Sequence, residues 1–306
     1  TLKNGDRISL FSPVKNEDEY MDNIGWGALM GILKHYNILG PFISASNDAF
    51  NRLKPGFEAP THPVASIGKD KKSGSRNRTV LIGLVKDESS PFSTRFELRS
   101  PNPHTNVFLC LSSLFQCALD GISYALTNDK TSAQLETEFC KKPEDITDYL
   151  PNNRLFRTEK DIFSEYTDEE RDRYFGSAPG NVYESISMLS ATLEGQSILT
   201  DGDVFTTQII QSYSLAMLNM WRLELSEKII PHNIEVLRGL IPLHTSTNGN
   251  DLDKQRWHEI DQLKMRLTKD DINSLSLIGK IRKELAGDNL KEVSDLQLEM
   301  ERLMTE

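Results

Sequence analysis

The chain has 306 residues, of which 38% are hydrophobic and 26% are charged, and it carries a formal net charge of −10 with a pI near 5.2. This composition is typical of a globular protein and excludes a disordered chain, and the length suffices for one large domain or two ordinary ones. The acidic balance argues against a nucleic-acid-binding protein, which usually presents a basic face.

The start of the chain and its apolar runs favour a cytoplasmic protein without a membrane span. Residues 1–6 are polar, with neither a secretory signal nor an initiator methionine, so we expect Thr1 to be a boundary rather than a natural start. The longest apolar run, residues 106–119, is too short to span a bilayer and predicts a core helix. The three cysteines lack metal-ligand spacing, and we expect reduced, buried thiols.

The first part of the chain predicts helices and loops around two strands. Residues 24–39 repeat apolar side chains at helical spacing, and Gly40-Pro41 is expected to end this helix. The stretch RLKPGFEAP at 52–60 reads as a loop. Residues 80–85 predict a buried strand because they are apolar and partly β-branched.

The stretch TRFELR at 94–99 predicts a second strand, because it alternates strictly. Arg95, Glu97 and Arg99 point to one face of an extended strand. Phe96 and Leu98 point to the other face. The strand leads, through two prolines, directly into the predicted core helix.

The second part of the chain is mostly helix-prone. Residues 127–180 are polar and acidic without a strong period, whereas residues 182–200, 203–225 and 233–240 favour helices. A break at 248–251 precedes a charged region with three apolar stripes, which predicts a helical hairpin or three short helices.

The candidates for chemistry are charged residues of the first hundred positions. They are five arginines and two glutamates beside apolar segments: Arg52, Glu58, Arg76, Arg78, Arg95, Glu97 and Arg99. Arginine presents a planar fork suited to carboxylates and phosphates, and a carboxylate among arginines can ligate a phosphate-bound cation. Taken alone, however, RFELR is more typical of a solvated strand face with surface ion pairs.

The order of the motifs is far more specific than any one of them. NRLKPGFEAP at 51–60, SRNR at 75–78, TRFELRSPNPHTN at 94–106 and a helix ending in LDGI resemble, in this order, the catalytic domain of glutamine synthetases. GILKHYNIL, DVFTTQIIQSY and EKIIPHNIEVLRGL extend the resemblance to about residues 1–240. It implies an α+β fold with an antiparallel sheet flanked by helices, to which the sequence adds a helical C-terminal extension.

The resemblance implies a reaction, its ligands and a division of the chain. Members of this family join ammonium to glutamate with ATP and Mg²⁺ or Mn²⁺, through γ-glutamyl phosphate, in homo-oligomeric rings. We expect a catalytic core over 1–126, the remainder of the catalytic domain over 127–240 and the extension over 241–306. Since the family's metal-binding histidine would lie just before Thr1, the chain resembles the C-terminal part of a longer synthetase, and we expect it to be inactive alone.

Seven residues match functional positions of the family. Glu97 matches a metal-binding glutamate, Arg78 the arginine over the transferring phosphate, and Arg95 a nucleotide-phosphate contact. Arg52 and Arg99 match arginines that bind glutamate. Glu58 matches the flap glutamate that closes the site and takes a proton from ammonium, and Asn47 a residue of the substrate pocket.

Three departures from the family pattern stand out. Gly83 replaces an arginine that contacts ATP. The segment GKDKKSGS at 68–75 is added, either as a solvent loop or as a source of new phosphate contacts. Residues 241–306 have no counterpart in short bacterial enzymes.

His35 is expected to be structural, and Tyr149 to be an ordinary loop tyrosine rather than a modification site.

Two alternatives remain open from the sequence. One is a catalytically impaired synthetase-like scaffold or regulator, suggested by Gly83 and the added helices. The other is a related acid–amine ligase with a different amine or acid.

Overall fold

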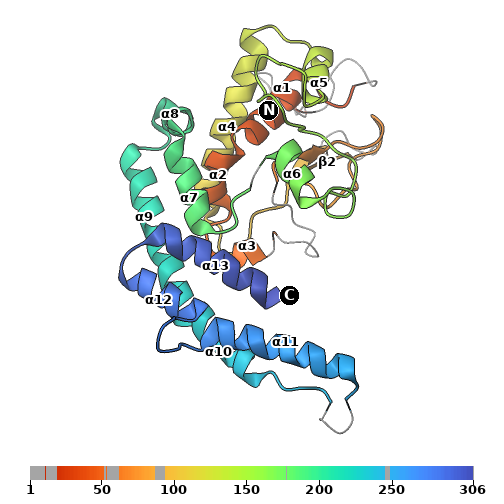
Figure 1. Cartoon of the computed structure of the whole chain (residues 1–306). Helices are drawn as coiled ribbons and strands as arrows, with labels where there is room; N and C mark the ends of the chain where they lie inside the picture. The colour runs from red at the N-terminus through yellow and green to blue at the C-terminus, as the bar shows by residue number, and fades with distance from the viewer. Residues whose placement is uncertain are drawn as a thin grey trace. The chain divides into compact units, whose positions relative to one another are not determined.

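A computed structural model describes residue 11 and residues 19–51, 53, 62–86, 94–176, 178–244 and 249–305 (Figure 1). Contacts divide the chain into two compact units, Thr1–Ser214 and Leu215–Glu306, and the division falls inside helix α9 (Thr207–Glu224). The three-part division by function stays a prediction.

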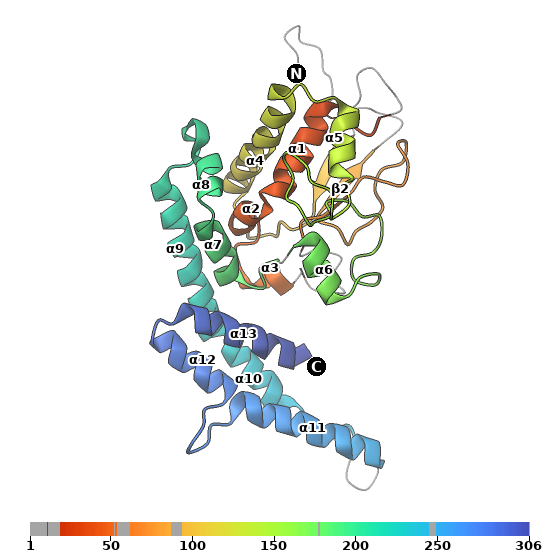
Figure 2. The same ribbon diagram turned by 45° about the horizontal axis from the view of Figure 1, so that its top comes forward.

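The core of the first unit is built on two helices that lie side by side, α1 (Asn23–Lys34) and α4 (Val107–Thr127) (Figures 1 and 2). Asp22 caps α1 and Asn106 caps α4, because the side chain of each accepts backbone N–H groups of the first turn. Helix α4 confirms the helix predicted from the apolar run.

Glycines set the distance between α1 and α4. Gly27 and Gly31 on α1 face Gly121 on α4, and a Cβ added to any of the three would overlap backbone atoms of the opposite helix. A Cβ on Gly31, for instance, would meet the carbonyl oxygen of Cys117. Backbone atoms cannot move aside as a flexible side chain can, so these positions exclude larger residues. The two helices therefore form one tightly packed block.

The first helical segment breaks earlier than its sequence predicts. Helix α1 gives way to α2 (Tyr36–Ile43) at His35, and Pro41 lies inside α2. The expectation that Gly40-Pro41 ends the helix is therefore wrong. The imidazole of His35 is buried, and its Nε2 lies 2.8 Å from Oδ2 of Asp120 on α4. A tertiary contact thus accompanies the break, and the structural role expected for His35 is confirmed.

The sheet has three strands, β1 (Ala65–Ser66), β2 (Ile82–Val85) and β3 (Arg95–Leu98). Strands β2 and β3 pair antiparallel, whereas β1 and β2 pair in parallel. The sheet is therefore mixed, and the predicted antiparallel sheet is wrong in this respect. A parallel pair needs a connection of about a dozen residues or more, which the segment 67–81 supplies.

One face of this sheet packs on the α1–α4 core. Ile82 and Leu84 are fully buried there, and Phe96 and Leu98 join the same apolar cluster. The charged residues of β3 point to the opposite face, which confirms the alternation predicted for RFELR. Beyond β3, the hydroxyl of Thr105 donates to the carbonyl of Ile43 at 2.7 Å, which ties the connection into α4 to the end of α2.

Short helices complete the first unit: α3 (Asn47–Asn51), α5 (Ser132–Phe139), α6 (Asp168–Phe175), α7 (Val182–Ala191) and α8 (Leu193–Thr200), followed by a 3₁₀ turn at Asp201–Asp203. The segment 127–180, which shows no strong period, contains α5 and α6. Both start with a capping box, at Thr131 and Thr167, and both end on a fully buried phenylalanine. A capping box thus marks the start of each helix, and a buried phenylalanine packs its end into the protein.

The second unit contains the end of α9, a π-helical turn (Leu225–Ile229), α10 (Ile230–Gly239), α11 (Asp251–Thr268), α12 (Leu277–Ala286) and α13 (Leu290–Thr305). Helices α11, α12 and α13 confirm the helical extension, in the form of three helices. Buried side chains of two predicted stripes, Ile278, Ile281 and Met300, form part of its core.

Helix α4 is long and apolar enough to cross a membrane by length and composition alone. Its inner face packs on α1, with Cys110 and Cys117 buried as expected, whereas Cys140, which follows α5, is exposed. Phe108 and Phe115 on the outer face are 84% and 62% exposed. One face of α4 is therefore part of the core, as predicted. That the protein has no membrane-spanning segment stays a prediction.

Candidate functional site

The polar face of the sheet carries three charged residues predicted for the site, two of them within β3. Gly83 on β2 lies opposite Glu97 on β3, and Val85 lies opposite Arg95. Ser66 on β1 is aligned with Gly83, so that Ser66, Gly83 and Glu97 form one row across the three strands. The side chains of Arg95 and Glu97 are exposed, so a charged ligand can approach them from solvent.

Arg99 extends this face just beyond the end of β3. Its Nη2 lies 3.2 Å from Oε2 of Glu97, and its Nη1 donates to the carbonyl oxygen of Asn77. The Arg99 side chain is only 11% exposed, whereas that of Glu97 is 51% exposed. A Cβ added to Gly83 would lie 2.6 Å from Arg99 Nη2. Gly83 therefore leaves the space that the guanidinium occupies, and Arg99 links β3 to the RNR motif.

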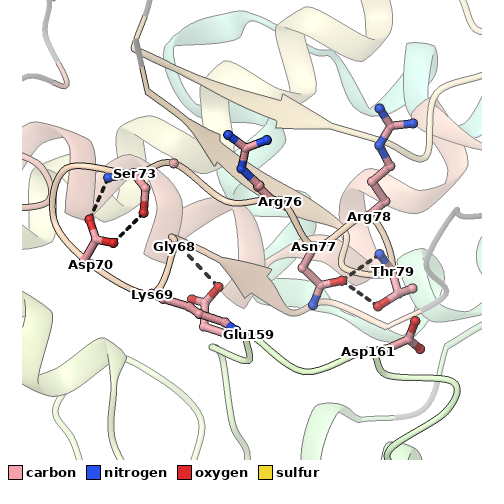
Figure 3. A pocket seen from close by; sticks show the side chains of 11 residues that line it. Gly68, Lys69, Asp70, Ser73, Arg76, Asn77, Arg78, Thr79, Glu159 and Asp161 are labelled. Atoms are coloured by element: carbon pink, nitrogen blue, oxygen red, sulfur yellow. Dashed lines mark hydrogen bonds between the residues drawn. The ribbon is translucent and has the colours of Figure 1, made fainter. Parts of the chain in front are cut away.

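The RNR motif forms a turn that its central residue holds in place. Asn77 Oδ1 accepts from Thr79 N at 2.9 Å and from Thr79 Oγ1 at 2.7 Å, and Asn77 Nδ2 donates at 2.7 Å to a backbone carbonyl of the 158–161 segment. Arg76 and Arg78 are exposed. Figure 3 shows both guanidinium groups on one side of the turn and Asp161 on the other. The turn thus presents two cations in one direction.

The added segment between β1 and this turn is a loop closed by its own side chains. Asp70 accepts from Lys72 N at 2.9 Å, from Ser73 N at 2.8 Å and from Ser73 Oγ at 2.7 Å. These bonds, led by that of the Ser73 backbone, lower the pKa of Asp70. Gly68 has φ +99°, a left-handed conformation that favours glycine. The three lysines of the loop are exposed.

Glu159 fixes the base of this loop from a distant part of the sequence. Its carboxylate accepts from Ile67 N at 3.1 Å, from Gly68 N at 3.3 Å and from the hydroxyl of Ser66, and Arg157 Nε lies 3.2 Å from it. Glu159 is not among the residues predicted for the site, because it lies in a polar segment without hydrophobic periodicity or a motif. Only the fold brings it beside the loop.

A pocket of about 620 Å³ lies between these segments (Figure 3). Its walls come from the added loop, the RNR turn and the 158–161 segment, and the lining residues include Lys69, Asp70, Arg76, Asn77, Arg78, Glu159 and Asp161. The volume lies within the range of about 300–1,000 Å³ typical of small-molecule sites. The lining carries three basic side chains and three carboxylates, so the pocket presents charges of both signs to a ligand.

Three other residues predicted for the site, Asn47, Arg52 and Glu58, precede the RNR turn in the sequence. Asn47 begins helix α3, where its side chain is buried. Arg52 and Glu58 lie outside the described residues, so their roles stay predictions. The structure thus gathers Arg78, Arg95, Glu97 and Arg99 around the sheet face and the RNR turn.

Glu97 is the residue predicted to bind a metal ion, and its carboxylate can be compared with the ligands that Mg²⁺ prefers. The described part of the chain holds no group of three or more His, Cys, Asp or Glu side chains that could bind a metal ion. Mg²⁺ in phosphate-transfer sites is commonly held by one or two carboxylates together with phosphate oxygens and water. The half-exposed carboxylate of Glu97 fits one such ligand position.

A second polar cluster joins α1, α4 and the loop that carries Tyr149. Asp120 Oδ2 accepts from the Tyr149 hydroxyl at 2.5 Å, in addition to its contact with His35. These hydrogen bonds, with that of His35 first, lower the pKa of Asp120 against the effect of its partial burial. Lys34 Nζ lies 4.1 Å from the centroid of the Tyr149 ring. The buried, bonded Tyr149 therefore holds its loop to α1 and α4.

Comparisons with known proteins give a consistent picture. A sequence model described as "Glutamine synthetase, catalytic domain" matches residues 4–154. The glutamine synthetase of Pseudomonas aeruginosa is 32% identical over 155 residues, which cover 47% of this chain and 30% of that protein. The enzyme of Aquifex aeolicus is 27% identical over 206 residues, covering 67% of this chain and 35% of that protein. This chain thus spans about a third of the length of these relatives.

Two further similarities were found. A 3-hydroxylaminophenol mutase of Cupriavidus pinatubonensis is 30% identical over 146 residues, covering 44% of this chain and 29% of that protein. A solved structure of the Plasmodium falciparum glutamine synthetase aligns at a TM-score of 0.45 and 18% identity, over 80% of this chain and 43% of that chain.

Proposed function

Because this chain belongs, through residues 4–154, to the glutamine synthetase family, we propose that it contributes to the ATP-dependent ligation of ammonium to glutamate. In this reaction the γ-carboxylate of glutamate attacks the terminal phosphorus of ATP and ADP leaves. Ammonia then attacks the acyl carbon of γ-glutamyl phosphate, and inorganic phosphate leaves. Since the chain spans about a third of its relatives' length, the complete reaction is proposed for an assembly that includes this chain.

In this proposal the arginines of the site bind anionic groups. Arg99 and Arg52 bind the glutamate, whose carboxylates match a planar guanidinium fork. Arg78 stabilises the phosphoryl group during its transfer, when negative charge shifts onto the leaving oxygen. Arg95 binds the phosphates of the nucleotide, and Asn47 helps to shape the substrate pocket.

The two glutamates have different tasks in the proposal. Glu97 would be one ligand of Mg²⁺ or Mn²⁺, and the cation would neutralise part of the phosphate charge when bound. Glu58 closes the glutamate side of the site and takes a proton from ammonium, a task that suits a carboxylate in a site from which water is excluded.

The observation that carries this proposal is the position of Arg99. Its two hydrogen-bonding contacts connect the metal-ligand candidate Glu97 with the carbonyl of Asn77 in the RNR turn. A carboxylate and several arginines on one exposed face are the components that a phosphate-bound cation and an acidic substrate require.

Titration calorimetry with Mg²⁺–ATP tests the nucleotide part. We expect binding by the wild-type chain, and affinity about 10- to 150-fold lower in Arg78→Ala, because one charge-assisted contact is worth about 1.5–3 kcal/mol. Arg256→Ala, which removes an exposed arginine from α11, is the matched control and should bind as the wild type. A wild-type chain that binds no nucleotide would contradict the proposal. Release of ADP with glutamate and ammonium then tests catalysis.

A second candidate function has its own support. Gly83 stands where the family has an arginine, and one relative carries the name of a mutase. A synthetase-like regulator would bind the nucleotide without releasing ADP, and a related ligase would release ADP only with another amine or acid. An ADP-release assay over a panel of amines separates these cases. Assembly into homo-oligomers and a cytoplasmic location are part of the main proposal and are measurable by light scattering and by cell fractionation.

A further inference from the structure

Two buried serine hydroxyls of the first unit have no hydrogen-bond partner among the described residues. Ser44 directly follows helix α2 and is 3% exposed, and Ser185 lies in α7 and is 1% exposed. Neither hydroxyl oxygen meets a donor or acceptor of the described chain. A buried hydroxyl without a partner costs free energy, and such groups in folded proteins are commonly bonded to an ordered water molecule. The two serines therefore point to a ligand.

Both serines line one small cavity between α2 and α7, which pack side by side (Figures 1 and 2). A Cβ added to Gly40 in α2 would lie 2.9 Å from the hydroxyl oxygen of Ser185, so this oxygen comes close to the α2 backbone. Phe50, Leu53 and Pro179 add apolar surface to the lining. The cavity has a volume of about 10 Å³, and a single water molecule requires about 10–15 Å³. The cavity thus has room for one water and for no organic ligand.

A third polar group follows from the proline inside α2. In an α-helix each carbonyl oxygen accepts from the backbone N–H four residues later, but Pro41 has no N–H to donate to the carbonyl of Asn37. Asn37 also lines the cavity. Together with the two serine hydroxyls, this carbonyl completes a set of three polar groups, and an internal water molecule typically makes about three hydrogen bonds.

The lining favours a neutral ligand over a cation. No charged side chain is among the described residues that line the cavity. Burial raises the pKa of Tyr36, another lining residue, to about 12, so its phenol adds no negative charge at neutral pH. An ammonium ion is similar in size to a water molecule, but it would lose its hydration here without a carboxylate to balance its charge.

From these observations we propose that one buried water molecule occupies the cavity and joins α2 to α7. It exchanges hydrogen bonds with the hydroxyls of Ser44 and Ser185, and it donates to the carbonyl of Asn37 that Pro41 leaves without its helical donor. The inference goes beyond the proposed function, because no lining residue belongs to the sheet or to the RNR turn. It holds whether or not the chain binds a nucleotide.

The site has a structural consequence for a residue predicted to shape the substrate pocket. Helix α3 begins at Asn47 and supplies Phe50 to the cavity lining. The water-linked pair of α2 and α7 therefore forms part of the support on which α3 packs.

Alanine substitutions in the full 306-residue chain distinguish a water-bonded hydroxyl from an unpaired one by the sign of the effect. If the water bridges the serines, Ser44→Ala and Ser185→Ala each remove a partner and should lower the melting temperature by about 2–4 °C. The two effects should not add in the double variant, because both act on one water molecule. Unpaired hydroxyls predict the opposite, since removal of a buried polar group without a partner is neutral or stabilising.

Ser187→Ala is the matched control, because Ser187 is an exposed serine two positions further along α7. This variant should melt within about 1 °C of the wild type.

A high-resolution crystal structure gives the direct measurement. We expect one ordered water molecule within hydrogen-bonding distance of both serine oxygens in the wild type. Absence of its electron density, or unchanged or higher melting temperatures of both single variants, overturns the inference. Replacement of sodium chloride by ammonium chloride should leave the melting temperature unchanged. A rise that both serine variants abolish would identify a cation site instead and would overturn the inference as well.

Discussion

The guanidinium of Arg99 lies over Gly83, where an added Cβ would come within 2.6 Å of Arg99 Nη2. The absence of a side chain at position 83 and the inward position of Arg99 are therefore two aspects of one arrangement. The guanidinium of Arg99 thus occupies the space that a side chain at position 83 would need.

Gly83→Ala should displace Arg99 without unfolding the protein. The contact is with the end of a flexible side chain, which can swing away, and alanine in a strand is favoured over glycine by about 0.5–1 kcal/mol. We expect an unchanged or slightly higher melting temperature, and a crystal structure in which Arg99 no longer contacts Glu97. Gly239→Ala, at a position with no atom within 4 Å of the added Cβ, is the control. An unmoved Arg99 would contradict this account.

Gly121→Ala should destabilise the first unit strongly. The added methyl group would overlap the Gly27 carbonyl and the Gly31 backbone, so α1 and α4 would have to separate. Overpacking of this kind costs about 1–3 kcal/mol, and we expect the upper part of that range in the free energy of unfolding by urea. Ser123→Ala, an exposed change two residues further along α4, should remain within about 0.5 kcal/mol. Similar values for the two variants would show that the helices are not in fixed contact.

Removal of Asp120 should change how stability depends on pH. The pKa of Asp120 is held below its ordinary value of 3.8, chiefly by the hydrogen bond with His35. Its contribution to stability is therefore complete above pH 3.8 and is lost as the pH falls through the lower pKa of the folded state.

We expect Asp120→Asn to be less stable than the wild type at neutral pH, and the difference to shrink in acid. Urea unfolding at several pH values measures both effects. Asp148→Asn is the control, because its carboxylate is 78% exposed in a surface pair with Lys130, and such pairs contribute little. A difference that is constant down to pH 2 would rule out a role for the Asp120 charge.

Glu159→Ala should loosen the base of the added loop. The substitution removes the acceptor for the Ile67 and Gly68 amides, and leaving such donors unmatched costs about 1–3 kcal/mol. Hydrogen exchange should become faster at these two amides, and proteases should cleave the loop sooner. Glu165→Ala, which removes an exposed carboxylate 3.9 Å from Lys160, serves as the control. Unchanged exchange at Gly68 would refute the role given to Glu159.

The sequence predicts the local elements of this site better than its long-range contacts. Alternation in RFELR identifies the strand and its two faces, because the period of two is a property of the extended chain itself. The parallel pairing of β1 leaves no such signature, since it depends on where the segment 67–81 returns. The break at His35 is likewise absent from the local pattern, in which Gly40-Pro41 is the stronger signal.

In the candidate site, too, residues within motifs could be predicted from the sequence, whereas residues brought in by long-range contacts could not. Motif order points to Arg78, Arg95, Glu97 and Arg99, which the structure gathers around the sheet face and the RNR turn. Glu159 could not be found in this way, because its partners Ile67 and Gly68 lie about 90 positions away and no residue type or spacing near it is distinctive. The roles of Arg52 and Glu58, outside the described residues, depend on the family resemblance alone.

The glycine contacts between α1 and α4 have a consequence for how the site can evolve. Strand β3 packs on this helix pair through Phe96 and Leu98 and continues into α4 through a connection that Thr105 ties to α2. Glu97 and Arg99 are thus held by a frame of closely packed elements, namely β3 and the helices α1 and α4, whereas Lys69 and Arg76 belong to loops. Loops tolerate changes in length and charge better than packed elements do, so these loops can vary while the frame keeps the carboxylate and the guanidinium in register.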